Sequence, residues 1–261
     1  MRTGVLVKMG VIGGLAALLL GGCVIHTDRF KAEFSRSEDL TVPATDITAL
    51  DVTTNVGKIQ LETADAAAVR IAAEIKVKAR TEEEARKLAE QVRIVAEPWS
   101  RTLTIKAVKP AGFGRNQLSV DFTITAPAAL TLNCTTNVGD IRIAGFTKRV
   151  RASADVGTII CTGLREDIDL RANVGDLRAT YASDAPAALN ATMATDVGSI
   201  EFTGPQEISA DLTAAVNVGD INTNRPLTVR GSLTKHSVRA TLGKGEGRVN
   251  LKADVGSIRI R

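Results

Sequence analysis

A short segment built around Val-Gly recurs along the chain and constrains its fold more than any other feature. Its seven copies are TTNVGKIQL (53–61), TTNVGDIRI (135–143), SADVGTIIC (153–161), RANVGDLRA (171–179), ATDVGSIEF (194–202), AVNVGDINT (215–223) and KADVGSIRI (252–260). The motif glycines after the first copy are Gly139, Gly157, Gly175, Gly198, Gly219 and Gly256, at intervals of 18, 18, 23, 21 and 37 residues. Periods near twenty residues are typical of solenoids.

Apolar residues recur at fixed distances from each motif glycine. Seven residues before the glycine stand Leu50, Leu132, Val150, Ile168, Ala191, Leu212 and Val249, and an Ile or Leu stands two residues after it. Each copy therefore indicates two short alternating strands around a Val-Gly corner. This pattern predicts an all-β fold, a single-stranded parallel β-helix (β-solenoid) over residues 39–261, in which each coil buries its apolar face against its neighbours. Right-handed winding is the default for parallel connections.

The interval of 37 residues before Gly256 is about two periods long. We interpret RATLGK (239–244) as a degenerate copy within it, with Gly243 in place of the motif glycine. On this interpretation His236 falls on an inward position. The chain then ends in a last coil, IRIR (258–261), which has no cap of its own.

The corners carry a regular pattern of amides and carboxylates. The residue two before each glycine alternates between Asn and Asp along the chain: Asn137, Asp155, Asn173, Asp196, Asn217 and Asp254. Stacked strands lie about 4.8 Å apart, so carboxylates in successive coils would repel one another. We therefore predict an Asn/Asp ladder in which each Asn donates to a neighbouring Asp. The same stacking predicts ion pairs between Arg149 and Asp167, Arg151 and Asp169, and Arg178 and Glu201.

Residues 66–128, approximately, interrupt the repeat. VRIAAEIKVKA (69–79) alternates as a strand, and TEEEARKLAEQV (81–92) has a capping box, Thr81 with Glu84, before an apolar stripe. Two alternating segments then flank PWSR (98–101), which indicates a hairpin. We predict a strand–helix–hairpin insertion that caps the N-terminal end, because solenoid ends expose apolar interior and unpaired edges.

The first residues resemble a bacterial lipoprotein signal peptide. Arg2 and Lys8 precede the apolar run 9–20, and LGGC (20–23) resembles a lipobox. The resemblance implies that residues 1–22 are removed and that Cys23 is acylated, followed by a polar tether over 23–38. Val24, which is not Asp, favours an outer-membrane destination under the lipoprotein sorting rules. The alternative is an ordinary secretory signal with an incidental cysteine.

With its signal, insertion and Val-Gly repeats, the chain resembles the adhesin-like β-helix domains of uncharacterised bacterial envelope proteins. The resemblance covers about residues 40–261 and includes the entry segment ITAPAALTLN (124–133). It implies a solenoid fold and an adhesin-like role in the envelope. It brings no catalytic residue and no cofactor to this chain.

Residues suited to catalysis or metal binding are scarce. The two histidines, His26 and His236, assemble into no Ser/His/Asp or Cys/His set, so we expect no catalytic residue, metal or cofactor. Cys134 and Cys161 fall on inward positions of different strands, and facing sheets lie about 10 Å apart, which favours two buried thiols over a disulfide. Calcium at the corners is the disfavoured alternative, because each corner has one carboxylate. Aromatic residues make up 3% of the chain, which argues against nucleic acid as a partner.

The C-terminal segment 224–261 is basic, with nine Lys or Arg residues against two Asp or Glu. We consider that part of this segment contacts an anionic envelope polymer or another envelope protein, through Arg225, Arg230, Arg239, Lys244, Arg248, Lys252 and Arg259. The plainer alternative is a set of solvated outward positions.

These observations together predict a non-enzymatic, lipid-anchored protein of the cell envelope. Its rigid β-solenoid would serve binding or scaffolding, and its oligomeric state is left open. Two alternatives remain: an enzyme acting on polysaccharides, as other parallel β-helices do, and a scaffold that self-assembles through the uncapped last coil.

Overall fold

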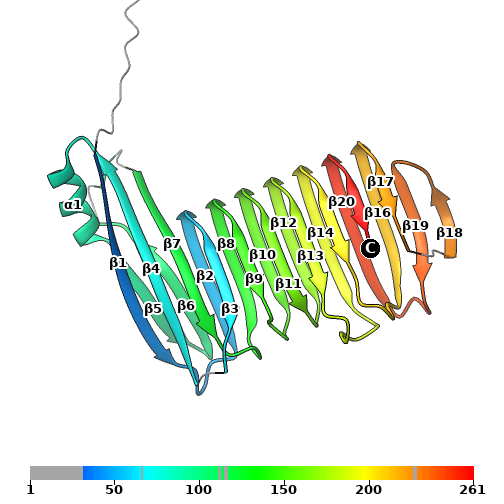
Figure 1. Ribbon diagram of the computed structural model, residues 1–261, viewed down its shortest axis with the longest axis horizontal. Helices are drawn as coiled ribbons and strands as arrows, with labels where there is room; N and C mark the ends of the chain where they lie inside the picture. The colour runs from blue at the N-terminus through cyan, green and yellow to red at the C-terminus, as the bar shows by residue number, and fades with distance from the viewer. Residues whose placement is uncertain (1–31, 66, 111–112, 115–116, 226–227) are drawn as a thin grey trace, which may run out of the picture.

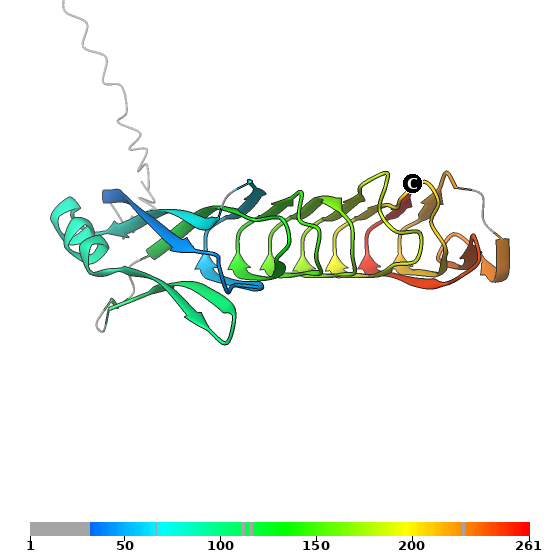
Figure 2. The same cartoon turned by 90° about the horizontal axis from the view of Figure 1, so that it is seen from below.

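The computed structural model describes residues 32–261 except 66, 111–112, 115–116 and 226–227. Two β-sheets, one of ten strands and one of eleven, face each other along an elongated molecule (Figures 1 and 2). We call one strand of each sheet, joined by a Val-Gly corner, a coil. The predicted all-β fold with long parallel sheets is confirmed.

The ten-stranded sheet contains, in spatial order, β1 (Ala32–Pro43), β4 (Ala68–Ala79), β7 (Gln117–Ala126), β3 (Ile59–Thr63), β9 (Ile141–Ala144), β11 (Ile159–Leu164), β13 (Leu177–Tyr181), β15 (Ile200–Thr203), β21 (Ile258–Ile260) and β17 (Ile221–Thr223). The eleven-stranded sheet contains, in spatial order, β18 (Thr228–Leu233), β19 (Ser237–Leu242), β16 (Ala210–Val218), β20 (Gly247–Val255), β14 (Asn190–Val197), β12 (Ile168–Val174), β10 (Val150–Val156), β8 (Thr131–Val138), β2 (Ala49–Val56), β6 (Thr102–Val108) and β5 (Arg93–Trp99).

Equivalent positions of successive coils stack on one another. Val150 of β10 lies opposite Leu132 of β8 on one side and Ile168 of β12 on the other, and all three are buried. The core between the sheets is therefore a series of aliphatic rows, as the inward positions of the repeat predict. Short aliphatic side chains suit this narrow interior because each coil must match the coil next to it.

The motif glycines form a single row along the corners. Their φ angles lie between +134° and +152°, a backbone region that side chains with a Cβ rarely adopt. A Cβ on Gly175 would also overlap the carbonyl oxygen of Gly157 in the adjacent coil. Glycine recurs at the corner because both its conformation and the close stacking of coils exclude any side chain.

The last two coils do not stack in sequence order. β20 and β21 lie between β14 and β15 on one side and β16 and β17 on the other, so the C-terminal coil is interior (Figure 1). Leu251 thus packs between Met193 and Ala214. The expectation that the chain ends in an outermost, uncapped coil is wrong.

The proposed degenerate coil at 239–244 is also wrong. β19 runs antiparallel to β16, because the chain reverses at a turn in which the Thr234 amide donates to Ser237 O over 2.9 Å. β18 pairs with β19, and the Ile221 amide of β17 donates to Lys235 O over 2.9 Å. This hairpin covers the distal end of the solenoid.

At the other end, residues 32–38 form the first part of β1, not a tether. β1 pairs with β4 along twelve residues, and its side chains alternate between a half-buried and an exposed face. Between β3 and β8, the chain forms β4, helix α1 (Glu82–Gln91), the antiparallel pair β5–β6, and β7. β4 and β7 extend the ten-stranded sheet and β5 and β6 extend the other, so these strands continue the solenoid.

Helix α1 begins after Thr81, whose hydroxyl accepts a hydrogen bond from the Glu84 amide over 3.2 Å. Its buried residues are Ala85 and Ala89, and it packs against β1 and β4. The described residues contain no helix with the length and apolar character needed to span a bilayer.

Candidate functional site

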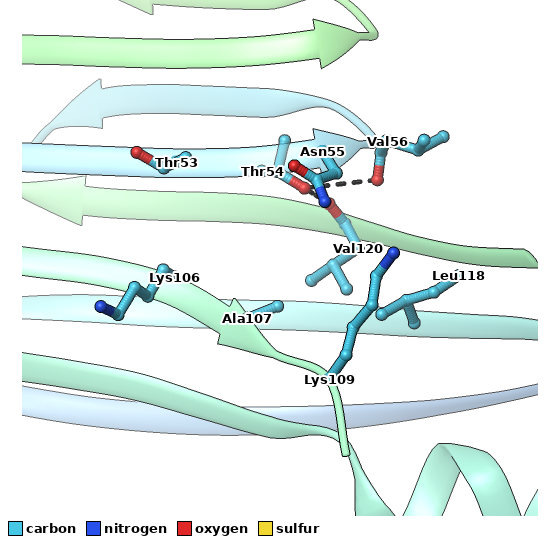
Figure 3. A pocket seen from close by; sticks show the side chains of 9 residues that line it. All are labelled: Thr53, Thr54, Asn55, Val56, Lys106, Ala107, Lys109, Leu118 and Val120. Atoms are coloured by element: carbon cyan, nitrogen blue, oxygen red, sulfur yellow. Dashed lines mark hydrogen bonds between the residues drawn. The ribbon is translucent and has the colours of Figure 1, made fainter. Parts of the chain in front are cut away.

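Two adjoining pockets lie where the first coil meets the N-terminal strands. The smaller has a volume of about 130 Å³ and the larger about 610 Å³. Val56, Lys109 and Leu118 line both, so the pockets form one trough. We call it the lysine trough because Lys76, Lys78, Lys106 and Lys109 line it. Figure 3 shows the smaller part.

Both sheets contribute walls to the lysine trough. β6 pairs in parallel with β2 and places Lys106 beside Thr53. β4 pairs antiparallel with β7, which brings Lys76 and Lys78 level with Ser119 and Gln117. The outward alternation of these strands directs Lys76, Lys78 and Lys106 away from the aliphatic core, and Lys109 follows the end of β6.

At the floor of the trough, the Thr54 hydroxyl is close to backbone carbonyls of β2 and β7. The buried Thr54 hydroxyl lies 3.2 Å from Val120 O and 3.3 Å from Val56 O, within hydrogen-bonding distance of both (Figure 3). Leu118 is buried beside them, and Val56 is 41% exposed. The floor therefore combines the apolar Leu118 and Val56 side chains with a hydroxyl that can donate its one hydrogen to either carbonyl.

The four lysines are not equivalent. Lys76 Nζ lies 2.9 Å from Glu74 and 3.0 Å from Asp121, and hydrogen bonds to these two carboxylates raise the pKa of Lys76. Lys78 pairs with Glu33 over 3.1 Å. Among described side chains, no carboxylate oxygen lies within 4.0 Å of Lys106 or Lys109. Lys109 Nζ stands 5.9 Å from the centroid of the Phe113 ring.

This arrangement can bind an anion that has an apolar part. Lys106 and Lys109, which pair with no carboxylate among the described residues, are available to the anionic group, and Val56 and Leu118 supply an apolar contact beside them. No sequence motif marks the trough, because its residues come from five separate strands and the segment after β6. The one local signal is the first corner, NVGK, in which Lys58 stands where later corners have Asp, Thr or Ser.

The predicted corner ladder lies along one edge of the molecule. Asn173 Nδ2 donates to Asp155 Oδ1 over 3.3 Å, and Asn217 Nδ2 donates to Asp254 Oδ1 over 3.1 Å. Asn137 is in the coil next to Asp155. Strict alternation fails at one point: Asp196 and Asp254 are neighbours, because β20 inserts between β14 and β16. The expectation of alternating carboxylates assumed the wrong coil order.

A second row at the corners was not predicted. Aspartates directly after the glycine accept hydrogen bonds from backbone amides of the next coil: Asp140 from Thr158 over 3.1 Å, and Asp176 from Ser199 over 2.8 Å. Asp121 accepts equivalently from the Lys58 amide over 2.8 Å. The signal available in the sequence was the pairing of NVGD with a following DVGT or DVGS.

The valine before each motif glycine is exposed, which the alternation of the strands did not indicate. The seven side chains are between 41% and 63% exposed and form a row: Val56, Val138, Val156, Val174, Val197, Val255 and Val218. The row begins at the lysine trough, because Val56 lines it.

The basic C-terminal residues do not form one surface. Arg239, Arg248 and Lys252 are exposed on the eleven-stranded sheet, and Arg259 is exposed on the ten-stranded sheet. Lys244 is exposed in the turn after β19, and Arg230 lies in β18 with its side chain outside the described part. The residues lie on two sheets whose outer faces point in opposite directions, and contact with an anionic polymer stays a prediction.

Two of these residues already have partners within the chain. Arg225 is half-buried, its Nη2 donates to Gly204 O over 2.7 Å, and burial lowers its pKa. Lys252 pairs with Asp254 over 3.1 Å. Both side chains thus have a partner within the chain, and the Lys252 side chain is still 61% exposed.

The cysteines and histidines of the described residues do not come together in a catalytic or metal-binding arrangement. Cys134 and Cys161 are buried free thiols, as predicted, and burial raises the pKa of Cys161 to about 12. His236 is exposed in the turn between β18 and β19, not on an inward position. Cys23 and His26 lie outside the described residues. The part of the chain that the structure describes contains no group of three or more His, Cys, Asp or Glu residues suited to a metal.

Comparison with known proteins gives a family and a fold. The family described as Toastrack DUF4097 matches residues 39–261. A proposed cell adhesion protein from Clostridium sporogenes has a similar structure, with a TM-score of 0.53, 16% identity, and coverage of 87% of this chain and 99% of that one. For a proposed adhesin from Bacteroides fragilis the TM-score is 0.44 at 16% identity, with coverage of 89% and 99%. No curated protein matches.

Proposed function

Because the chain belongs to the Toastrack DUF4097 family, we propose that it is a non-enzymatic, adhesin-like module for binding or scaffolding in the cell envelope. In this proposal Cys23 is acylated and anchors the protein, with the outer membrane as its destination. The solenoid holds its binding surfaces at fixed distances from that anchor.

The observation that carries the proposal is the continuous stack of parallel strands. Registers between adjacent coils match residue for residue from β2 to β16 on one sheet. Repetition of this kind produces a stiff rod with extended, regular faces, and such faces are what repeat proteins use for binding. The likeness to the Clostridium sporogenes protein supports the same fold.

The charges on the rod support a non-enzymatic role. Enzymes that act on polysaccharides need clustered, available carboxylates in a cleft. Here carboxylates of adjacent coils pair with arginines, Arg149 with Asp167 over 3.2 Å and Arg178 with Glu201 over 2.9 Å. Arg151 pairs with Asp169 over 3.6 Å. These ion pairs were predicted from the repeat and are confirmed.

The self-assembling scaffold is less well supported by the coil order. The proposed contact was an uncapped C-terminal coil, but that coil is interior and the distal end carries the β18–β19 hairpin. Sedimentation of the full chain in detergent over a wide range of concentrations tests this point. We expect a sedimentation coefficient that does not change with concentration, and polymer formation would favour the scaffold instead.

Anchoring is tested by metabolic labelling with a fatty acid, followed by separation of membranes. The wild-type chain should incorporate the label and sediment with the membrane, and Cys23→Ser should do neither. Binding is tested on an array of envelope glycans at physiological salt and at about 0.5 M salt, which shortens the screening length. We expect retention of anionic glycans that falls at high salt. An unlabelled chain that binds no envelope component would refute the proposed function.

A further inference from the structure

The lysine trough lies close to the point where the chain would leave the membrane. Glu33, the second residue of β1, lines the trough. Cys23 precedes Glu33 by ten residues in the sequence. Ten fully extended residues span at most about 36 Å. An acyl anchor at Cys23 would therefore hold the trough within that distance of the lipid headgroups.

The charge of the first corner differs from that of the six later corners. Six of the seven corners carry one aspartate, and the first corner carries none, with Asn55 and Lys58 at the equivalent positions. Lys106 and Lys109 add two ammonium groups that no described carboxylate neutralises. The first corner, Lys106 and Lys109 thus form a local positive patch, at an end of the molecule where helix α1 also carries Glu82, Glu83 and Glu84.

The shape of the site fits a surface layer better than a small ion. The larger part of the trough is about 610 Å³, which exceeds the space that one phosphate needs. Val56 projects from the corner and lines both parts, next to the buried Leu118. An apolar side chain among amines matches the boundary between headgroup phosphates and acyl chains.

From these observations we infer that the lysine trough docks on the phosphate-bearing headgroups of the membrane that holds the Cys23 anchor. This inference rests on the proposed function, because it needs the anchor. Phosphate oxygens accept hydrogen bonds from Lys106 and Lys109, and Val56 contacts the glycerol and upper acyl region. Docking places the β1–β7 end against the membrane and the β18–β19 hairpin at the distal end.

Lysine footprinting of the full, acylated chain tests the docking. The protein is placed in vesicles of phosphatidylethanolamine with phosphatidylglycerol, or of phosphatidylcholine alone, and labelled with a water-soluble amine reagent. Mass spectrometry then gives the labelling rate of each lysine. In the anionic vesicles we expect Lys58, Lys106 and Lys109 to react at least about threefold more slowly than in phosphatidylcholine. Lys244, exposed at the distal end, should react equally in both.

Matched variants separate docking from general changes in the protein. In Lys106→Gln/Lys109→Gln, Lys58 should lose its protection in anionic vesicles. In Lys244→Gln, which removes one ammonium group far from the trough, Lys58 should stay protected. Circular dichroism of both variants verifies that the fold is intact. Protection of Lys58 that persists in the double variant would overturn the inference.

Other occupants give different results in the same experiment. If millimolar inorganic phosphate protects Lys106 and Lys109 equally in phosphatidylcholine vesicles, the trough is a small-anion site and membrane docking is wrong. If the intact mass shows acylation but the three lysines react alike in both vesicles, docking is wrong while the proposed anchor stands. If the intact mass shows no acyl group, the proposed anchor is wrong, and the docking inference, which depends on it, is wrong as well.

Discussion

Single residues at the corner determine how closely the coils stack. Six of the seven motif glycines face the carbonyl group of the glycine in the neighbouring coil, and Gly57 faces that of Val120, at distances that leave no space for a methyl group. The polar residues on either side of the glycine form hydrogen bonds between coils, with backbone amides or with the side chain of the neighbouring corner. Corner residues therefore contribute to stability mainly through contacts with the adjacent coil. The effect of a corner substitution on stability can be predicted from the residues at the same position in the two neighbouring coils.

Gly175→Ala should be among the most damaging single substitutions in the chain. Its φ of +152° disfavours a Cβ, and the added methyl group would overlap Gly157 O, so two coils must separate. We expect a loss of about 4 kcal/mol or more in the free energy of unfolding, measured with urea. Gly163→Ala is the matched control, because its φ is +69° but the nearest atoms to its Cβ lie 3.4 Å away. The control should cost about 1–2 kcal/mol, and equal losses would contradict the stacking argument.

Asn173→Asp should destabilise the protein in a pH-dependent way. The new carboxylate would lie between Asp155 and Asp196, and it would replace the donor that now binds Asp155. Repulsion raises the folded-state pKa of the added group, so the destabilisation is present above that pKa and disappears as the pH falls through it. We expect a loss of about 1 kcal/mol at neutral pH that is recovered near pH 3, measured by thermal unfolding.

Asn137→Asp is the control for that experiment. Its neighbours in the row are Asn55 and Asp155, so the added charge meets one carboxylate in place of two. The loss at neutral pH should be about half as large. A melting temperature of Asn173→Asp that does not vary with pH relative to wild type would argue against the repulsion.

The buried thiols should make the protein sensitive to alkali. Burial raises the pKa of Cys161 from 9.0 to about 12, so the folded state keeps a neutral thiol that the unfolded state ionises. The contribution of this thiol is complete below pH 9.0 and declines as the pH rises from there towards 12. In urea unfolding, the stability advantage of wild type over Cys161→Ala should narrow by up to about 1.4 kcal/mol between pH 9 and 10. A constant difference across this range would show that the thiol is not desolvated.

Among the elements, β20 has the greatest effect on the architecture. It pairs with β14 on one side and β16 on the other, so two segments that are consecutive in the chain are held apart by the C-terminal strand. The connection from β17 to β20 contains β18 and β19. It is long enough to cover the distal end of the solenoid and to bring the chain back between β14 and β16. The final residues of the chain are therefore an internal support of the stack.

Cysteine pairs can verify this strand order. Thr192→Cys with Asn250→Cys places cysteines on paired positions of β14 and β20, about 4.8 Å apart and within the range of a disulfide. Thr192→Cys with Thr213→Cys places them two strands apart, at about 9.6 Å, beyond that range. We expect a disulfide in the first variant only, detected by mass spectrometry of non-reduced peptides. A disulfide in the second variant would indicate that β14 and β16 are adjacent, so that the coils stack in sequence order.

The whole molecule is a one-dimensional stack in which each coil contacts its two neighbours. Its N-terminal end consists of β1, β4 and β7 on one sheet and β5 and β6 on the other, with α1 beside β1 (Figure 1). Its distal end consists of the β18–β19 hairpin (Figure 2). In such an array a local defect weakens the units that depend on it more than distant ones.

Hydrogen exchange should show this dependence. Leu251→Ala removes a buried side chain from β20, through which β16, β18 and β19 connect to the rest of their sheet, while β17 connects through β21 of the same coil. We expect faster amide exchange in β16–β19 with little change in β8 and β10. Leu132→Ala in β8 is the matched control and should instead affect β2 and β10. Uniform acceleration in both variants would indicate that the solenoid unfolds as one unit.

The amino-acid sequence by itself determined the coil: the glycine corner, the inward aliphatic positions, the paired charges of adjacent coils and the capped helix after Thr81. These features are either local, as in the helix, or periodic, because every coil must turn, bury and pair in the same way as the coil next to it. Only the tertiary structure decided the order of the coils, because copies with the same apolar pattern can stack on one another in any order. It also decided the position of the lysine trough, whose residues, from Glu33 to Val120, come together only when both sheets close around the first corner.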